Sequence, residues 1–429
     1  MFKYVIVIFI FLAQCLHGQN LYFPPNTGTS WETLDPINLG WKTDALPELK
    51  NFLEETNTKA FIILKDGKIA VEYYLNGHDA SSSWYWASAG KSLTSTLIGM
   101  AVSEGKIDLQ KPSSEYLGKK WTSLSPSQEE KIKVIHHLNM TTGLDDSNFE
   151  CTDPECLTFK AEPGSRWAYH NGPYTLCDGI IEGATSKNLN AYFKEKLGSK
   201  IGMNGIFVKS GYNNIFYSKA RDMARFGLFI LSKGNWKEEV IFSDKSYFEK
   251  MINTSQDINL SYGYLWWLNG KGSFQLPKSQ LKFNMNLVPN APLDMLCALG
   301  KNDQKIYVIP SENLVIIRMG EAGTADSNPV PIKYDFALWE KLNPVLNLTS
   351  SVKTTYFNKE KVSFVKNKSI FIDENIDAVD VKIYDLQGKL VHNFSHKNSS
   401  EIYHLPSGIY LVFLTDKNKK MYINKIWIR

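Results

Sequence analysis

The sequence predicts a mixed α+β domain followed by a small C-terminal β-sandwich. Residues 60–74 have the pattern of two strands, several helical segments follow, and a second pair of strands falls within 305–318. A domain with strands near both ends of its chain can build one sheet from both, with the helices packed around it. From about residue 361 the pattern changes to short alternating strands separated by glycine turns, which is typical of a sandwich.

The N-terminus has the pattern of an export signal. Lys3 precedes the apolar run Tyr4–Leu12, which is shorter than the roughly 20 residues of a membrane span. We therefore expect residues 1–18 to be a signal peptide that is cleaved near Gly18. The alternative is a lipoprotein signal ending at Cys15, although the bulky Gln14 stands where a small residue is usual.

The elements of the α+β domain follow from periodicity and turn residues. Residues 44–57 predict a helix, the Asp66-Gly67 turn predicts a hairpin, and a helix that begins near Ser88 is closed by Gly105. Further helices are expected at 188–197, 219–231 and 331–342, and strands at 305–309 and 314–318. A polar linker is expected at 346–360, followed by strands at 379–384, 390–394, 409–414 and 421–429.

Composition argues against several classes of partner. The net charge is only +4, from 48 basic and 44 acidic side chains, so no global field attracts nucleic acid. No metal or other cofactor is expected, because His136 and His137 are adjacent and the chain has no Cys-x-x-Cys. Beyond the leader, no segment is long and apolar enough for a stable membrane span.

Four cysteines remain after the leader. Cys151 and Cys156 flank a proline turn, and in an oxidising compartment this pattern predicts a small disulfide-closed loop. The alternative is a pair of exposed free thiols. Cys177 and Cys297 lie in apolar surroundings, which favours small buried side chains over a metal pair.

Ser88 is the strongest candidate nucleophile. Lys91 follows it by three residues at the start of an apolar helix, so the amine can lie beside the hydroxyl and help remove its proton. The helix N-terminus adds free N–H groups that favour developing negative charge. The same Ser-x-x-Lys spacing recurs four more times, but only Ser88 opens such a helix. A plain N-cap serine with a solvated lysine is the alternative.

With these residues in view, residues 30–345 resemble the serine β-lactamase and penicillin-binding superfamily, in its class C-like esterase and 6-aminohexanoate-dimer hydrolase branch. The resemblance is carried by the hairpin and the Ser88–Lys91 helix, Leu138–Leu144, Glu162–Asn171 and Gly300–Pro310, in that order. It implies an antiparallel sheet flanked by helices, with an additional helical subdomain. It also implies an acyl-enzyme formed on Ser88.

The resemblance implies further site residues. Tyr169-His-Asn171 matches the Tyr-x-Asn element and follows the Pro-Gly-x-x-Trp segment that precedes it in this branch. Tyr169, coupled to Lys91, is expected to take the Ser88 proton and later to protonate the leaving group. It would act as a phenolate stabilised by the nearby amine. Asn171 is expected to position the substrate or the lysine.

The last landmark departs from the family pattern. Lys301-Asn-Asp303 stands where relatives have Lys-Thr-Gly or His-x-Gly, so a side chain replaces the glycine. Lys301 is expected to offer a positive charge to a substrate carboxylate, and the N–H of Gln304 to be the second oxyanion donor. The carboxylate of Asp303 is expected to repel a substrate carboxylate or to neutralise Lys301, which would disfavour penicillin-like substrates. A surface Lys–Asp pair is the alternative.

Residues 361–429 resemble the type A C-terminal sorting domain of Bacteroidetes substrates of type IX secretion. The resemblance is carried by Val381–Lys389, Leu405–Leu411 and a basic final strand. It implies that the type IX machinery is a partner and that the tail is removed. It also implies export through the periplasm to the cell surface or the medium.

The sequence therefore predicts a secreted serine hydrolase that cleaves an amide or ester bond in a small or peptide-like substrate. A D-alanyl-D-alanine carboxypeptidase or penicillin-binding protein and a β-lactamase are alternatives within this class, because fold and catalytic residues do not fix the substrate. A catalytically inactive surface binding protein is the alternative of another class.

Overall fold

The computed structural model describes residues 21–323 and 332–348, together with parts of the C-terminal region (363–366, 369–372, 378–385, 390–394, 403–417 and 421–428). The expected signal peptide at 1–18, with Cys15, lies outside the described residues. So do residues 349–360 of the expected linker.

A six-stranded antiparallel sheet forms the centre of the first domain, with strand order β2-β1-β13-β12-β11-β8. The strands are β1 (Thr58–Lys65), β2 (Lys68–Tyr74), β8 (Trp267–Leu268), β11 (Leu296–Gly300), β12 (Gln304–Ile309) and β13 (Leu314–Gly320). Strand β1 pairs with β13, so the two ends of the domain meet at the middle of the sheet. The expected α+β architecture is confirmed.

The β1–β2 hairpin forms where the Asp-Gly turn predicts it. Asp66 and Gly67 both have left-handed backbone angles, with φ of 51° and 83°. Two such residues make the turn whose twist matches that of the paired strands. Gly67 also packs so closely on the backbone of Tyr22 that a Cβ would lie 1.9 Å from its carbonyl oxygen.

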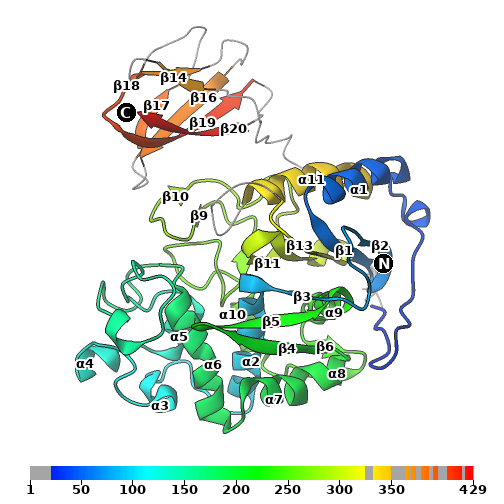
Figure 1. Ribbon diagram of the computed structural model, residues 1–429, viewed down its shortest axis with the longest axis vertical. Coiled ribbons are helices and arrows are strands. Elements are labelled where there is room, and N and C mark those ends of the chain that lie inside the picture. Colours follow the sequence, from blue (N-terminus) through cyan, green and yellow to red (C-terminus); the bar gives the residue numbers. More distant parts are fainter. Residues whose placement is uncertain are drawn as a thin grey trace, which may run out of the picture.

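Helices cover both faces of the sheet (Figure 1). Helix α9 (Ala220–Leu231) packs on β12 and β13, and Gly227 allows close approach because a Cβ there would meet Val315 at 2.4 Å. Helices α1 (Leu46–Glu55) and α11 (Ile332–Leu346) pack together beside β1. The expected helices at 44–57, 219–231 and 331–342 are therefore confirmed.

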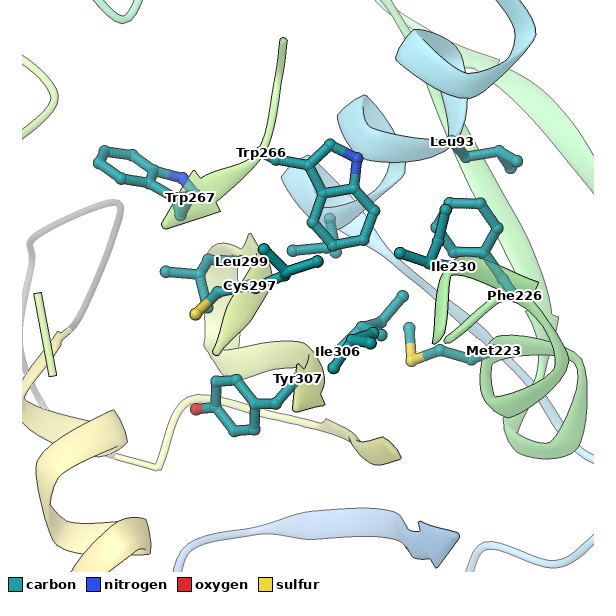
Figure 2. Close-up of a cluster of buried hydrophobic side chains, with 14 of the residues drawn as sticks. Leu93, Met223, Phe226, Ile230, Trp266, Trp267, Cys297, Leu299, Ile306 and Tyr307 are labelled. Atoms are coloured by element: carbon teal, nitrogen blue, oxygen red, sulfur yellow. The ribbon is translucent and has the colours of Figure 1, made fainter. Parts of the chain in front are cut away.

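The buried helix α2 (Gly90–Ser103) lies between the sheet and the helical part of the domain, where it packs against α6 and β11. Figure 2 shows Leu93 of α2 in one apolar cluster with Phe226 and Ile230 of α9 and with Trp266. The ring of Trp266 stacks on that of Phe226 with 6.1 Å between centroids. This packing fixes the start of α2 relative to the sheet.

The remaining elements complete the helical subdomain and its flanks. Its helices are α3 (Ser114–Leu117), α4 (Pro126–Glu129), α5 (Val134–Leu138), α6 (Asn171–Thr185), α7 (Leu189–Phe193), α8 (Ser199–Ile201) and α10 (Lys245–Met251). The minor strands are β3 (Ser83–Tyr85), β4 (Gly205–Ser210), β5 (Asn213–Lys219), β6 (Asn235–Trp236), β7 (Glu239–Val240), β9 (Phe274–Gln275) and β10 (Lys282–Phe283). The expected helix at 188–197 is divided into α7 and a wider π turn at Lys194–Gly198.

The C-terminal strands form two antiparallel sheets, as expected for a sandwich. One has the order β14-β15-β18 and the other β17-β16-β19-β20. The strands are β14 (Ser363–Lys366), β15 (Ser369–Ile372), β16 (Ala378–Asp385), β17 (Leu390–Phe394), β18 (Tyr403–His404), β19 (Gly408–Asp416) and β20 (Met421–Ile428). Within the described part of the chain, no helix has the length and apolarity needed to cross a bilayer.

A cluster of buried charges joins the sheet to α11. The Nζ of Lys305 lies 2.7 Å from Asp335 Oδ2 and 3.4 Å from Asp303 Oδ1, and all three side chains are buried. The hydroxyl of Tyr307 donates a hydrogen bond to the same Asp335. Because these groups are removed from water, each charge depends on its partners.

We expect Lys305→Met to lower the free energy of unfolding by about 3–5 kcal/mol, because it leaves two buried carboxyl groups without their cation. Urea denaturation measures this. Lys341→Met is the matched control, since its ion pair with Glu48 lies at the surface and its loss should have a much smaller effect. Equal losses in the two variants would show that the cluster does not hold α11.

Candidate active site

Ser88 lies in a short 3₁₀ turn, Ala87–Ala89, directly before α2. The preceding Trp86 is fixed to β5 twice, since its backbone N–H donates to Phe216 O (2.8 Å) and its indole N–H to Ser218 Oγ (2.9 Å). Ala87 adopts a left-handed backbone angle, φ 46°, which costs energy for a residue with a Cβ. The turn therefore presents Ser88 in one strained, well-anchored position.

Lys91 lies in the first turn of α2, and its side chain reaches back to Ser88. Its Nζ is 3.2 Å from Ser88 Oγ, 3.8 Å from the ring centroid of Tyr174 and 5.2 Å from that of Tyr169. Burial removes water from the amine and lowers the pKa of Lys91 to about 7, against a weaker opposing effect of the Asp178 carboxylate. A neutral amine beside the hydroxyl is therefore available near neutral pH.

Tyr169 is buried directly before α6, among aromatic side chains. Its ring stacks on Trp267 at 5.8 Å and meets Tyr262 edge-on at 6.2 Å. Burial raises the pKa of Tyr169 far above its ordinary value, and the neighbouring Ser88 hydroxyl opposes this only in part. This is opposite to the lowered pKa expected from the sequence, because burial among these rings disfavours the phenolate. Tyr169 is a neutral phenol in this site.

Asn171 is the first residue of α6, and its amide donates a hydrogen bond to the hydroxyl of Tyr212 at 3.1 Å. Its Oδ1 is buried without a hydrogen-bond partner among the described residues. An unpaired buried oxygen is costly and is common where a ligand group completes the bonding. Tyr212 comes from the β4–β5 turn, and nothing in the sequence pattern identified it.

The edge of β11 forms the opposite side of the site. Strand β8 pairs only with Leu296 and Cys297, so this edge is open at Gly300. A Cβ on Gly300 would lie 2.4 Å from Trp86 O and 3.0 Å from Ala89 N, the backbone on either side of Ser88. Gly300 is therefore the glycine that lets the strand approach the Ser88 turn, three residues before the position expected from the sequence.

The expectation for Asp303 is wrong. Asp303 is buried, its carboxylate faces Lys305 at 3.4 Å, and it accepts a hydrogen bond from Gly323 N at 2.9 Å. It is not paired with Lys301, which is exposed. The argument against penicillin-like substrates that rested on its charge therefore falls away.

The side chain of Gln304 is engaged in structural contacts. It is buried, and it both donates to Gly320 O (2.6 Å) and accepts from Gly320 N (3.1 Å). These bonds tie the start of β12 to the end of β13 rather than leaving the side-chain amide for a substrate. Gly300 is the residue of β11 that lies against the Ser88 turn, and the next backbone N–H is that of Lys301. The N–H of Lys301 is therefore nearer to this contact along the chain than the N–H of Gln304, which the sequence had suggested as the second oxyanion donor.

A buried carboxyl group lies behind Lys91 and was missed by sequence reasoning. Asp178 is on α6, where burial raises its pKa to about 7 and a hydrogen bond from Asn214 (2.8 Å) opposes that shift. Its other oxygen has no hydrogen-bond partner among the described residues. An aspartate inside an apolar helix pattern gave no signal of this position.

The loop before Tyr169 is closed by the expected disulfide between Cys151 and Cys156. Cys151 O packs against Gly172, where a Cβ would lie 2.1 Å away, so the loop is seated on the first turn of α6. Cys177 and Cys297 are buried free thiols, as expected. Among the described residues, no group of three or more His, Cys, Asp or Glu side chains is arranged to hold a metal ion.

Comparison with known proteins identifies the fold and the family. Residues 50–320 match the family model described as Beta-lactamase. The chain belongs to the beta-lactamase family.

Relatives of this beta-lactamase family member include a 6-aminohexanoate-dimer hydrolase of Paenarthrobacter ureafaciens. It is 25% identical over 272 residues, which cover 52% of this chain and 68% of that protein. The structure of a putative 6-aminohexanoate-dimer hydrolase from Bacillus anthracis has a TM-score of 0.56 at 20% identity, covering 75% of this chain and 89% of that one. An octameric penicillin-binding protein homologue from Pyrococcus abyssi has a TM-score of 0.55 at 16% identity, covering 90% and 98%. These structures share the fold.

Residues 366–429 match the secretion system C-terminal sorting domain. Such a domain directs its carrier to the type IX secretion machinery. This beta-lactamase family protein is therefore secreted or exposed at the cell surface.

We expect Gly300→Ala to slow the reaction of Ser88 with a fluorophosphonate probe by about 100-fold, because the added Cβ forces β11 away from the Ser88 turn and a displacement of about 1 Å has this effect on a positioned reaction. Gly90→Ala is the control. Gly90 borders the same turn, but a Cβ there meets Phe216 at an ordinary 3.6 Å. Wild-type labelling of Gly300→Ala would exclude the edge of β11 from the site.

Proposed function

We propose that residues 30–345 form a serine hydrolase that cleaves amide or ester bonds through an acyl-enzyme on Ser88. The observation that carries this proposal is the contact of 3.2 Å between Lys91 Nζ and Ser88 Oγ, made by a fully buried amine whose pKa is about 7. An amine held uncharged beside a hydroxyl is a general base at neutral pH.

The proposed reaction begins with proton transfer from Ser88 Oγ to the neutral Lys91 amine while the oxygen attacks the substrate carbonyl. The resulting oxyanion lies between the Ser88 N–H and the backbone N–H groups at the open edge of β11 beside Gly300. Tyr169, a neutral phenol, donates its proton to the leaving group and regains one from the Lys91 ammonium. Water then hydrolyses the acyl-enzyme, with the same groups moving protons in reverse.

The names of two relatives support a linear amide as the first candidate substrate. Two relatives carry the name 6-aminohexanoate-dimer hydrolase. Fold and catalytic residues are shared across many substrates, so D-alanyl peptides and β-lactams remain the second candidates. An inactive binding protein is disfavoured, because a charge-free buried lysine beside Ser88 is costly and has no role in mere binding.

We expect the rate at which a fluorophosphonate labels Ser88 to rise about tenfold per pH unit below pH 7 and to level off above it. The sign follows from the lowered pKa of Lys91: at pH values below about 7 the amine is an ammonium, which cannot accept the serine proton. Labelling at a series of pH values, followed by mass spectrometry of the modified peptide, gives the profile.

The variants Ser88→Ala and Lys91→Ala test the assignment. Ser88→Ala should abolish labelling while costing stability only about 1 kcal/mol, as for a lost cap. Lys91→Ala and Tyr169→Phe should each slow turnover by several orders of magnitude. The double variant should be little worse, since groups that act as one proton-transfer unit are not additive. A pH profile unchanged in Lys91→Ala would remove Lys91 from the mechanism.

We propose that the exported protein begins near Gln19 and loses residues 361–429 by cleavage within 345–365. Exposed linkers between domains are where chains are commonly cut. The intact mass of the protein recovered from culture medium measures both ends. A mass that includes the tail would make residues 361–429 a lasting accessory domain.

A further inference from the structure

We infer that Lys278, at the rim of the proposed site, recognises a carboxylate carried by the leaving group of the substrate. This rests on the proposed function of Ser88. It concerns a residue of the β9–β10 hairpin, which lies outside the family landmarks and supplies none of the catalytic groups.

A chain of contacts places Lys278 next to the catalytic tyrosine. The ring of Phe149 stacks near Tyr169, with 6.3 Å between centroids and 22° between planes. The Nζ of Lys278 lies 4.7 Å from the centroid of the same Phe149 ring. Phe149 is 8% exposed, whereas Lys278 is exposed. The exposed ammonium therefore rests on an aromatic ring that in turn packs against Tyr169.

The hairpin holds Lys278 in this place by several contacts. Its tip is closed by Gln275 Nε2 donating to Gln280 O at 3.1 Å, and Gln280 Nε2 donates to Trp167 O at 3.0 Å. The second bond ties the tip to the segment that carries Tyr169. Lys278 itself has φ of 60°, an angle that costs energy for a lysine and points to a constrained position.

The charges around the rim leave Lys278 available. Arg166 and Asp146 pair with each other at 2.8 Å, and Lys160 lies 3.6 Å from Asp145. None of the ion pairs formed by the described residues includes Lys278, so its charge is uncompensated by a neighbouring carboxylate. Glu150, next to Phe149 in the chain, is exposed and acts electrostatically on Lys91 and Tyr212, but within the described part of the chain it forms no ion pair with Lys278.

The proposed proton transfers indicate which end of the substrate would meet Lys278. Tyr169 is proposed to protonate the leaving group, and Phe149 contacts both Tyr169 and Lys278. A leaving group that emerges past Tyr169 and along Phe149 therefore ends near the ammonium. An amine or alcohol with an apolar body and a terminal carboxylate matches both surfaces.

The test compares two aryl esters that differ only in the charge of the leaving group, 4-carboxyphenyl hexanoate and its methyl ester. We expect Lys278→Gln to lower kcat/KM for the carboxylate ester about fivefold and to leave the methyl ester within twofold. Lys278→Arg should retain the wild-type kcat/KM for the carboxylate ester relative to the methyl ester, because it keeps the positive charge. Lys282→Gln removes another exposed lysine, from strand β10 of the same hairpin, and should change kcat/KM for neither ester. Because the contact is exposed, the effect should shrink as salt is added.

The outcomes separate this inference from the proposed function. If Ser88-dependent turnover persists and Lys278→Gln changes both esters equally, Lys278 only supports Phe149 and the inference fails alone. If Ser88 is neither acylated nor labelled by a fluorophosphonate, the proposed function fails and the inference with it. If Ser88 is labelled but the protein cleaves neither ester, the test becomes how well benzoate and benzamide each slow the fluorophosphonate labelling of Ser88. Equal protection in wild type and Lys278→Gln would then overturn the inference.

Discussion

The burial of one lysine amine beside one serine hydroxyl is the constraint around which this domain is organised. A shift of the Lys91 pKa from 10.5 to about 7 corresponds to roughly 5 kcal/mol of lost ammonium solvation. That cost is comparable with the net stability of a whole domain, so it must be offset by extensive packing elsewhere. The offset is visible in α2, which is buried along most of its length between the sheet and α6. This packing holds the Lys91 amine in place beside Ser88.

A second buried lysine in the same domain shows what decides between catalysis and structure. Lys305 is as buried as Lys91, but two carboxyl groups adjoin it, and their attraction outweighs desolvation and raises its pKa. Lys305 therefore remains charged and joins α11 to the sheet. Lys91 instead has aromatic rings as close neighbours, and the opposing effect of the Asp178 carboxylate is weaker than that of burial. Burial alone therefore does not set the charge of a lysine, because a close counter-ion reverses the direction of the pKa shift.

The parts of the site that the sequence predicted are those encoded locally. Ser88 and Lys91 are three residues apart at a helix start, and the Asp66-Gly67 turn carries its own backbone geometry, so neither needs knowledge of the tertiary fold. Gly300 was missed because the turn after β11 contains two left-handed residues, Asn302 and Asp303, where a glycine would be anticipated. The pKa of Tyr169 was misjudged for a related reason: its value depends on aromatic neighbours from distant segments.

The rim of the site depends on contacts that no local pattern encodes. Tyr212 enters from the β4–β5 turn, Phe149 from a loop fixed by the Cys151–Cys156 disulfide, and Lys278 from the β9–β10 hairpin. Each loop is attached to the segment around Tyr169 and Asn171 by its own packing or hydrogen bond. The loops can therefore vary in sequence without disturbing the Ser88 turn, which is anchored separately to β5. Under the proposed function, the chemistry belongs to the Ser88 turn, α2, Tyr169 and the edge of β11, while contacts with the rest of the substrate would come from three loops that meet only in the folded protein.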